Sequence, residues 1–323
     1  MKSYLTDIDG ILVGHYHDKK MGKGVTAILC KEGATPGVDV RGSAPGTRET
    51  DLIQSEKAVD KIHSVVLSGG SAYGLEASSG VMQFLEEQNI GFKTPFSLVP
   101  IVSQAVIYDL NSGDSCLRPD KSMGYKAAAR ASSSESSRGC VGAGYGASVS
   151  KALGWDKAVK SGLGSYTIKH GDLYVSALVV VNALGDVYRN GKQMTGPYDR
   201  TEKKMYSAYD ALKKTNIGFN NTNTTIGIIA TNGILNKPMA NKLASMGHDG
   251  YARAIKPVHT MSDGDTVFAM ATNKVKVENF DLVLALAADA MELAIHDAIE
   301  SSDSVNGYMS YKDMKKDIDA KTQ

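Results

Sequence analysis

One stretch of the chain decides its fold: Asn223-Thr224-Thr225-Ile226-Gly227-Ile228-Ile229-Ala230-Thr231-Asn232. The residues just before it, 218–222, are rich in asparagine, which is typical of a polar loop. From Ile226 onward the stretch is apolar and β-branched, which predicts a central, buried strand. The sequence therefore predicts a hydroxyl-bearing residue, Thr224, at the first position of a rigid strand.

This position has two interpretations. Thr224 could simply begin a strand, because hydroxyl residues are common where loops meet strands. Alternatively, a cut between Asn223 and Thr224 would free the α-amine of Thr224, which could then accept the proton of its own hydroxyl. An N-terminal nucleophile hydrolase needs this arrangement. The stretch alone does not decide between the two, so the rest of the chain must.

Composition limits the classes of partner. The chain has 323 residues, enough for one large domain or two smaller ones that bury about three quarters of the unfolded surface. Its 36 Lys and Arg nearly balance its 35 Asp and Glu, which argues against nucleic acid or an anionic membrane as partner. A small, neutral or mixed-charge ligand is expected instead.

Cysteine spacing and hydropathy limit the compartment. Cys30, Cys116 and Cys140 lie too far apart for a metal-binding motif, which predicts free, buried thiols in a reducing compartment. The first ten residues have no apolar run of signal-peptide length, and no eighteen consecutive residues are apolar. We therefore expect a cytoplasmic protein that does not enter a membrane.

The rest of the chain alternates short apolar runs with glycine-rich turns. Apolar, β-branched runs predict strands at 25–30, ended by turn residues around Gly33, and at 64–67. The segment 175–187 is among the most apolar, and its long run ends at Asn182, which could simply form a turn. Amphipathic or apolar patterns predict helices at 75–87, 121–132, 241–254 and 280–299. Residues 188–223 are polar, with a helical patch at 201–214, and predict a surface connection with little to bury. The charged end, 301–323, predicts a loose tail.

Two glycine-rich segments could bind a nucleotide. Ser68–Leu75 lacks the Gly-Lys-Ser/Thr ending of a P-loop. It also does not match a Gly-x-Ser-x-Gly elbow, because Tyr73 stands where that motif has its last glycine. Gly142, Gly144 and Ala147 match a dinucleotide fingerprint, but no predicted strand precedes them. Close packing of a strand against a helix is the favoured interpretation of the first segment. A nucleotide-dependent enzyme remains an alternative with little motif support.

Taken together, the segments resemble the DmpA-like family, which comprises L-aminopeptidase/D-Ala-esterase-amidases, β-peptidyl aminopeptidases and nylon-oligomer hydrolases. The resemblance covers nearly all of residues 5–300. It is carried by the order and number of five segments: Gly10–His15, Val38–Gly42, Pro45–Thr50, Leu67–Leu75, and Asn223–Thr225 with Ala230–Asn232.

The resemblance implies a fold and a maturation step. The fold would be α+β, a four-layer αββα sandwich similar to other N-terminal nucleophile hydrolases, in a single domain over 1–323. The precursor would cut itself between Asn223 and Thr224 into an α chain, 1–223, and a β chain, 224–323. Relatives form tetramers or larger assemblies, so a homo-oligomer of processed αβ units is expected.

The resemblance also implies the site residues. Thr224 would be both nucleophile and α-amine base, and Asn182, after the long apolar strand, would hold the oxyanion. Lys151 would lie beside the nucleophile and assist the oxyanion, while Asp263 and Asp265 would orient the amine and the hydroxyl. Lysine with two aspartates is more similar to the nylon-oligomer hydrolase branch than to the aminopeptidases.

The sequence departs from the aminopeptidase pattern at one place. Those enzymes carry a glutamate that recognises the free amine of the substrate, where this chain has Ala105-Val106-Ile107-Tyr108-Asp109. The resemblance thus implies hydrolysis of small peptides, amino-acid amides or esters without a metal or organic cofactor, and leaves strict aminopeptidase specificity open. The alternative is a non-catalytic homologue that acts as a binding or assembly protein.

Overall fold

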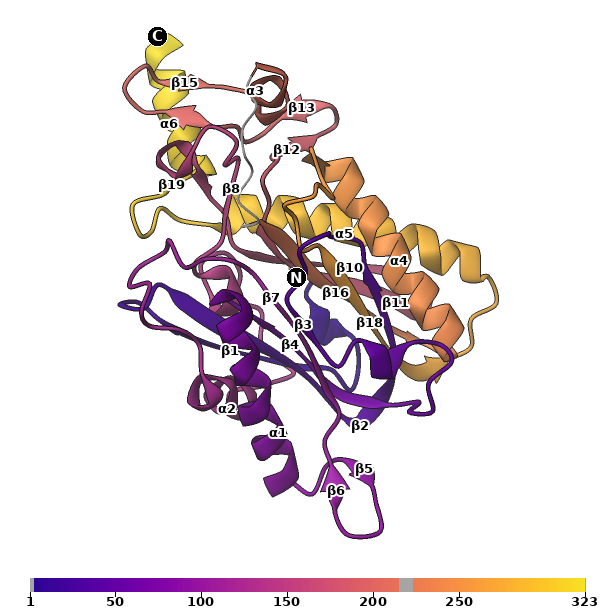
Figure 1. Cartoon of the computed structure of the whole chain (residues 1–323). Coiled ribbons are helices and arrows are strands. Elements are labelled where there is room, and N and C mark those ends of the chain that lie inside the picture. Colours follow the sequence, from indigo (N-terminus) through magenta and orange to yellow (C-terminus); the bar gives the residue numbers. More distant parts are fainter. Residues whose placement is uncertain (1–2, 215–222, 323) are drawn as a thin grey trace.

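One long strand, β2 (Lys23–Val40), joins the two sheets of the molecule (Figure 1). The computed structural model describes residues 3–214 and 223–322; the polar loop predicted at 218–222 lies outside these residues. The first half of β2 pairs with β1 (Leu12–Asp18) and β4 (Ile62–Ser68), and its second half pairs with β18 (Thr266–Val275). Because β2 changes partners along its length, it belongs to both sheets.

The change of partner occurs around Gly33. The register of β2 against β4 shifts between Leu29 and Ala34, and Gly33 has a φ of 78°. A glycine in this left-handed conformation lets a strand bend without ending it. The prediction that turn residues around Gly33 end the strand was therefore wrong.

The first sheet contains β10 (Leu163–His170), β11 (Leu173–Asn182), β16 (Thr224–Gly233) and β18. Within it, β16 lies between β11, which is antiparallel to it, and β18, which is parallel. The second sheet continues from β2 through β4 and β7 (Val102–Val106) to β3 (Thr47–Arg48), with β1 on the other side of β2. The predicted central strand thus lies in the middle of the first sheet.

Three apolar cores separate four layers. Alternate side chains of each strand point to opposite faces, so Ile226 and Ile228 enter the core between the sheets while Ile229 enters an outer core. That outer core lies under α4 (Lys237–Ala254) and α5 (Phe280–Ser301). A third core lies between the second sheet and α1 (Ala77–Glu87) with α2 (Lys121–Ala129). The predicted helix–sheet–sheet–helix sandwich is confirmed.

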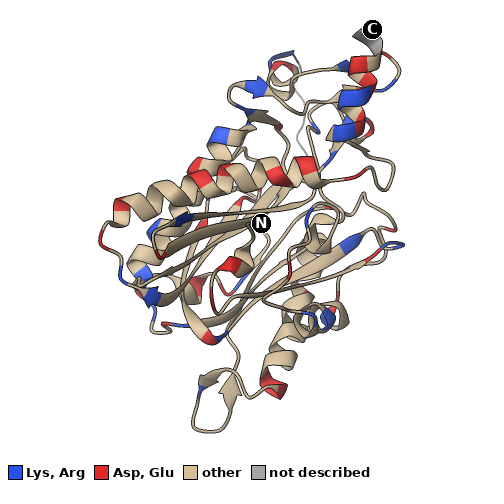
Figure 2. Ribbon diagram, turned by 180° about the vertical axis from the view of Figure 1, so that it is seen from behind, with Lys and Arg blue, Asp and Glu red and all other residues tan. Residues whose placement is uncertain are grey.

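The remaining elements are short. They comprise β5 (Phe92–Lys93), β6 (Leu98–Val99), β8 (Ser148–Val149), β9 (Val159–Lys160), β12 (Asp186–Arg189), β13 (Lys192–Gln193), β14 (Tyr198–Asp199), β15 (Lys204–Met205), α3 (Ala208–Lys214), β17 (Ile255–Lys256), β19 (Met309–Ser310) and α6 (Tyr311–Thr322), with 3-10 turns at Leu5–Asp7, Asp51–Ile53, Ser71–Glu76, Gly142–Gly144 and Trp155–Lys157. Acidic and basic residues are scattered over the helices and loops, and the strands are mostly neutral (Figure 2).

Two predictions about polar segments were wrong. The end of the chain is not a loose tail, because α6 packs on the outer core through Met314, which is 1% exposed. Charged residues make up most of α6, so the sequence did not show that each turn also carries an apolar side chain that can pack on the core. The connection from residue 188 also buries more than expected: Tyr198 is 2% exposed, and its hydroxyl donates to Asp317 at 2.6 Å. Only α3 is helical within the patch predicted at 201–214.

Helix length and hydropathy bear on membrane association. Among residues 3–214 and 223–322, no helix combines the length and the apolar composition required to span a bilayer.

Candidate active site

The predicted site residues meet at one end of the first sheet. Thr224 begins β16 and is 5% exposed. Asn182, the last residue of β11, lies directly opposite Thr224 in the antiparallel register. On the other side of β16, Asp263 pairs with Asn223 in an isolated parallel bridge just before β18. The sheet therefore brings residues far apart in the sequence to the Asn223–Thr224 bond.

The Asn223–Thr224 junction is held on both sides. The Thr224 hydroxyl donates a hydrogen bond to the carbonyl oxygen of Asn223. The same oxygen accepts the backbone N–H of Gly264 at 2.9 Å, and the N–H of Asn223 donates to the Ser262 carbonyl at 3.2 Å. A hydroxyl thus lies beside a carbonyl group that a backbone donor polarises.

Glycine is required beside this junction. A Cβ at Gly264 would lie 2.9 Å from Thr224 Oγ1 and 2.6 Å from the Ala44 carbonyl oxygen. The latter contact is with backbone and cannot relax easily. The Asp-Gly-Asp sequence at 263–265 therefore places two carboxylates around the one residue small enough to face the hydroxyl.

Lys151 and Asn182 are joined directly. Lys151 Nζ donates to the Asn182 carbonyl oxygen at 2.8 Å and to its Oδ1 at 3.1 Å. The Asn182 amide nitrogen donates to the Tyr108 carbonyl at 2.9 Å. Burial lowers the pKa of Lys151 to about 7, against the opposing effect of the Asp263 charge. Because a side-chain amide carries two N–H groups, Asn182 has a second donor beside Thr224.

The two aspartates have different partners. Asp265 Oδ1 accepts the backbone N–H of Thr225 at 2.6 Å, and its Oδ2 bonds His259. Asp263 Oδ2 accepts the N–H and hydroxyl of Thr260 at 2.8 and 2.7 Å, but its Oδ1 is buried and has no hydrogen-bond partner among the described residues. Burial, and then the Asp265 charge, raise the pKa of Asp263 to about 6.

Sequence reasoning missed His259, Thr260 and Gly264. All three lie within a few residues of the predicted aspartates, and the donors among them bond those carboxylates. Their proximity in His259-Thr260-Met261-Ser262-Asp263-Gly264-Asp265 was the available signal.

Asp109 lies in the segment where aminopeptidases carry an amine-binding glutamate. It is fully buried, and its Oδ1 accepts the Gly70 N–H at 2.6 Å. A Cβ at either Gly69 or Gly146 would lie 2.2 Å from its Oδ2. This carboxyl is enclosed by backbone rather than open to a substrate. The glycine-rich turn is accordingly a close-packed element, as predicted, with Gly74 packed on Gly69.

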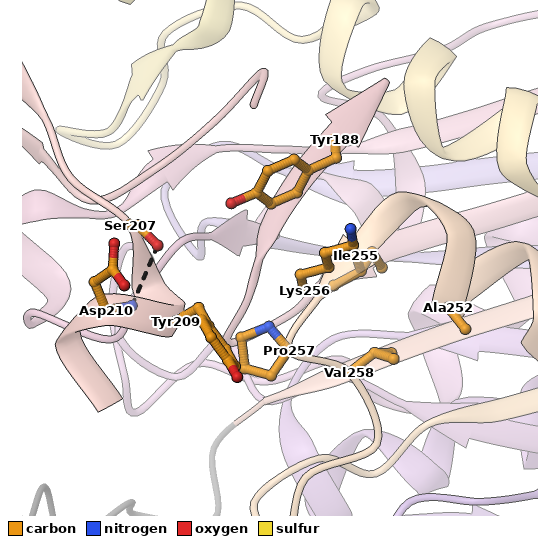
Figure 3. A pocket seen from close by; sticks show the side chains of 9 residues that line it. All are labelled: Tyr188, Ser207, Tyr209, Asp210, Ala252, Ile255, Lys256, Pro257 and Val258. Atoms are coloured by element: carbon orange, nitrogen blue, oxygen red, sulfur yellow. Dashed lines mark hydrogen bonds between the residues drawn. The ribbon is translucent and has the colours of Figure 1, made fainter. Parts of the chain in front are cut away.

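A cavity of about 670 Å³ is lined by residues outside the candidate site. Figure 3 shows Tyr209 and Asp210 of α3 on one side of it and Tyr188 with Lys256 on another. Its lining, drawn from the described part of the chain, includes none of the five predicted site residues. Pro257, in its wall, lies two residues before His259.

Comparisons with known proteins agree with this architecture. The model of peptidase family S58 matches residues 3–312. A protein of Mycobacterium tuberculosis described as an uncharacterized aminopeptidase is 38% identical, over 96% of this chain and 97% of its own length. A 6-aminohexanoate-oligomer endohydrolase of Kocuria sp. is 34% identical, over 83% of this chain and 75% of the enzyme.

Solved structures share the fold at low sequence identity. A β-aminopeptidase of Burkholderia sp. superposes with a TM-score of 0.72 at 19% identity, covering 99% of this chain and 93% of that one. The L-aminopeptidase D-Ala-esterase/amidase of Ochrobactrum anthropi, described as a variant of the Ntn hydrolase fold, gives 0.72 at 18% identity, covering 99% and 94%. With a family model that spans most of its length, this chain belongs to peptidase family S58 and is a hydrolase.

Proposed function

We propose that this chain is a self-processing amide hydrolase whose nucleophile is Thr224. Thr224 Oγ1 attacks the Asn223 carbonyl carbon, and the C–N bond between the two residues breaks as an ester forms. Water then hydrolyses the ester, which leaves a carboxylate on Asn223 and a free α-amine on Thr224. The observation that carries this proposal is the Thr224 hydroxyl bonded to the carbonyl that Gly264 polarises.

Self-cleavage needs a proton acceptor other than the amine. Before the cut, the nitrogen of Thr224 is an amide and has no basicity. Asp263 is the best-placed candidate, because it pairs with Asn223 and has a buried oxygen without a partner among the described residues. Its pKa of about 6 leaves it largely ionised at neutral pH, yet basic enough to accept a proton.

Hydrolysis of substrates uses the new amine. An α-amine has a pKa of roughly 7.7 to 8.0 and is partly neutral near pH 7, so it can accept the hydroxyl proton. Asp265, on the N–H of Thr225, fixes the start of the strand that carries this amine. The free N–H of Asn182, assisted by Lys151, donates to the substrate oxyanion, an effect worth about 3 to 4 kcal/mol.

The substrates are small peptides, amino-acid amides or esters. Relatives named as aminopeptidases and as a 6-aminohexanoate-oligomer endohydrolase support amide substrates. Because Asp109 is enclosed, the segment that would bind a free amine offers no exposed carboxylate. We therefore propose that a free substrate amine is not required. We also propose, as the family resemblance implies, that processed αβ units assemble as a homo-oligomer in the cytoplasm.

Intact-mass measurement tests the proposal. We expect the wild-type chain to give two fragments, 1–223 and 224–323, Thr224→Ser to split at the same bond, and Thr224→Ala to stay whole. Thr225→Ala is the matched control and should still split between residues 223 and 224. A folded wild type that stays whole would favour the non-catalytic homologue, and a split Thr224→Ala would exclude Thr224 as nucleophile. Thermal stabilisation by nucleotides would instead support the nucleotide-dependent alternative.

A further inference from the structure

His259 is a titratable residue that the proposed chemistry leaves without a role. It lies in the loop between β17 and β18, and its side chain is 19% exposed. Its Nδ1 lies 2.8 Å from Asp265 Oδ2, and its backbone N–H donates to the same oxygen at 3.2 Å. Since a carboxylate only accepts, Nδ1 carries the hydrogen. One residue therefore provides two donors to one carboxylate oxygen.

The other oxygen of Asp265 bonds the backbone of the residue that follows the proposed nucleophile. Asp265 Oδ1 accepts the N–H of Thr225 at 2.6 Å, and Thr225 is bonded directly to Thr224. A carboxylate held at one oxygen cannot rotate about its terminal bond, so the second oxygen keeps its direction. The His259 side chain is thus connected to the backbone at Thr224 through a single, 1%-exposed carboxylate.

Packing and backbone conformation fix the His259 ring. Its centroid lies 4.8 Å from that of His248, in an edge-to-face contact, and 6.2 Å from that of Tyr251. His248 donates to the Asp39 carbonyl at 3.0 Å, and its Nδ1 has no hydrogen-bond partner among the described residues, so His248 does not compete with His259 for Asp265. His259 itself has a φ of 55°. This left-handed conformation is unfavourable for a residue with a side chain and persists only where the surroundings determine it, often at functional sites.

We infer that His259 is a positioning residue for the nucleophile: it holds Asp265 in the orientation that places the N–H of Thr225, and with it the Thr224 hydroxyl, at the bond to be cut. This role rests on the proposed function, since it concerns the same nucleophile. Among the described residues, the Asn223 carbonyl accepts from Thr224 and Gly264 and not from His259, so the inferred role acts through Asp265.

Two substitutions separate the donor from the backbone conformation. Glycine adopts a φ of 55° freely but has no donor, whereas asparagine tolerates this conformation and its Nδ2 can replace Nδ1–H. In time-resolved intact-mass measurements we expect His259→Gly to slow self-cleavage about 10- to 100-fold, the range for a hydrogen bond to a charged group. His259→Asn should stay within about threefold of wild type, and added imidazole should accelerate His259→Gly.

A matched control tests the role of ring packing. His248→Phe keeps an aromatic ring in the same cluster and leaves both donors to Asp265 in place, so self-cleavage should change less than about threefold. Thermal unfolding of each variant shows whether it folds. Equal slowing in His259→Gly and His259→Asn would overturn the inference, because the ring alone would then matter. Wild-type speed in His259→Gly would overturn it as well.

A second experiment does not depend on cleavage. In the Thr224→Ala background the chain stays whole, and hydrogen exchange of the Thr225 amide reports its bond to Asp265. We expect His259→Gly to increase that exchange rate about tenfold or more and His259→Asn to leave it near the parent value. An unchanged rate in His259→Gly overturns the inference even if Thr224 is the nucleophile. A wild type that stays whole while this rate responds refutes the proposed function but leaves His259 as the residue that holds Asp265 against the Thr225 N–H.

Discussion

Asp263 and Asp109 are two buried acids with similar pKa values and different surroundings. Both are buried and have one oxygen without a hydrogen-bond partner among the described residues, and burial raises the pKa of each to about 6. Asp263 pairs with Asn223 at the Asn223–Thr224 junction. The free oxygen of Asp109 lies instead between Gly69 and Gly146.

The difference lies in what each carboxylate can reach. Asp263 is two residues from Asp265, and its backbone pairs with that of Asn223, so it lies beside the Asn223–Thr224 bond, whereas Lys151 is within the electrostatic influence of both acids. Asp109 is surrounded by glycine backbone, which leaves no space for a substrate atom. A shifted pKa therefore identifies a buried acid, while only the neighbouring atoms identify a catalytic one.

Neutralising each acid gives the largest contrast. Asp263→Asn removes the proposed proton acceptor and should slow self-cleavage about 10² to 10⁴-fold, the contribution of a positioned general base. Asp109→Asn should leave the rate within about threefold, because its carboxyl has no contact with the junction. Intact mass over time measures both. Comparable slowing in the two variants would mean that the position of each acid relative to the junction does not decide its effect on the rate.

Asn182 connects the candidate site to the segment that contains Asp109, because its amide donates to the carbonyl of Tyr108, the residue before Asp109. Asn182→Ala removes the proposed oxyanion donor, and we expect kcat of the processed enzyme to fall about 10² to 10³-fold with little change in KM. Steady-state kinetics on the processed fraction checks this. A rise in KM at constant kcat would instead assign Asn182 to substrate binding.

The pH dependence of self-cleavage should follow Asp263. Its carboxylate must be ionised to accept a proton, and with a pKa of about 6 the rate should rise nearly tenfold per pH unit below 6 and level off above it. Above pH about 7, loss of the Lys151 charge should lower the rate again if that charge supports the oxyanion. Measured in the Asp109→Asn variant, the rising limb should be unchanged.

Local patterns were enough to predict much of the fold. The apolar run after Thr224 and the apolar helix at 280–299 appear as β16 and α5, since periodicity within one element depends only on its own residues. The continuation of β2 through Gly33 was not predictable in this way. It depends on two different partner strands, β4 and β18, that are remote in the sequence.

The clustering of the candidate site residues was predictable to the same degree. Thr224, Asn182 and the two aspartates stand at the ends of predicted strands, and the sheet register brings them together. The different hydrogen-bond partners of Asp263 and Asp265 could not be predicted, because they depend on which loop donors each carboxylate meets. His259 reaches Asp265 only because its own backbone takes a left-handed conformation that no residue pattern indicated.

The smallest expected effect is on stability and concerns Asp109 alone. Its pKa is about 6 when folded and about 3.8 when unfolded, so its contribution to stability is fully present below pH 3.8 and is lost as pH rises through 6. Asparagine does not titrate, so the free energy of unfolding of Asp109→Asn relative to wild type should rise by about 1 to 3 kcal/mol between pH 4 and pH 7.

Chemical denaturation of the Thr224→Ala chain and its Asp109→Asn double variant at both pH values measures this difference without interference from cleavage. A difference that stays constant with pH would mean that Asp109 is ionised throughout, with its negative charge stabilised by Lys23 and Lys160 more than burial opposes it.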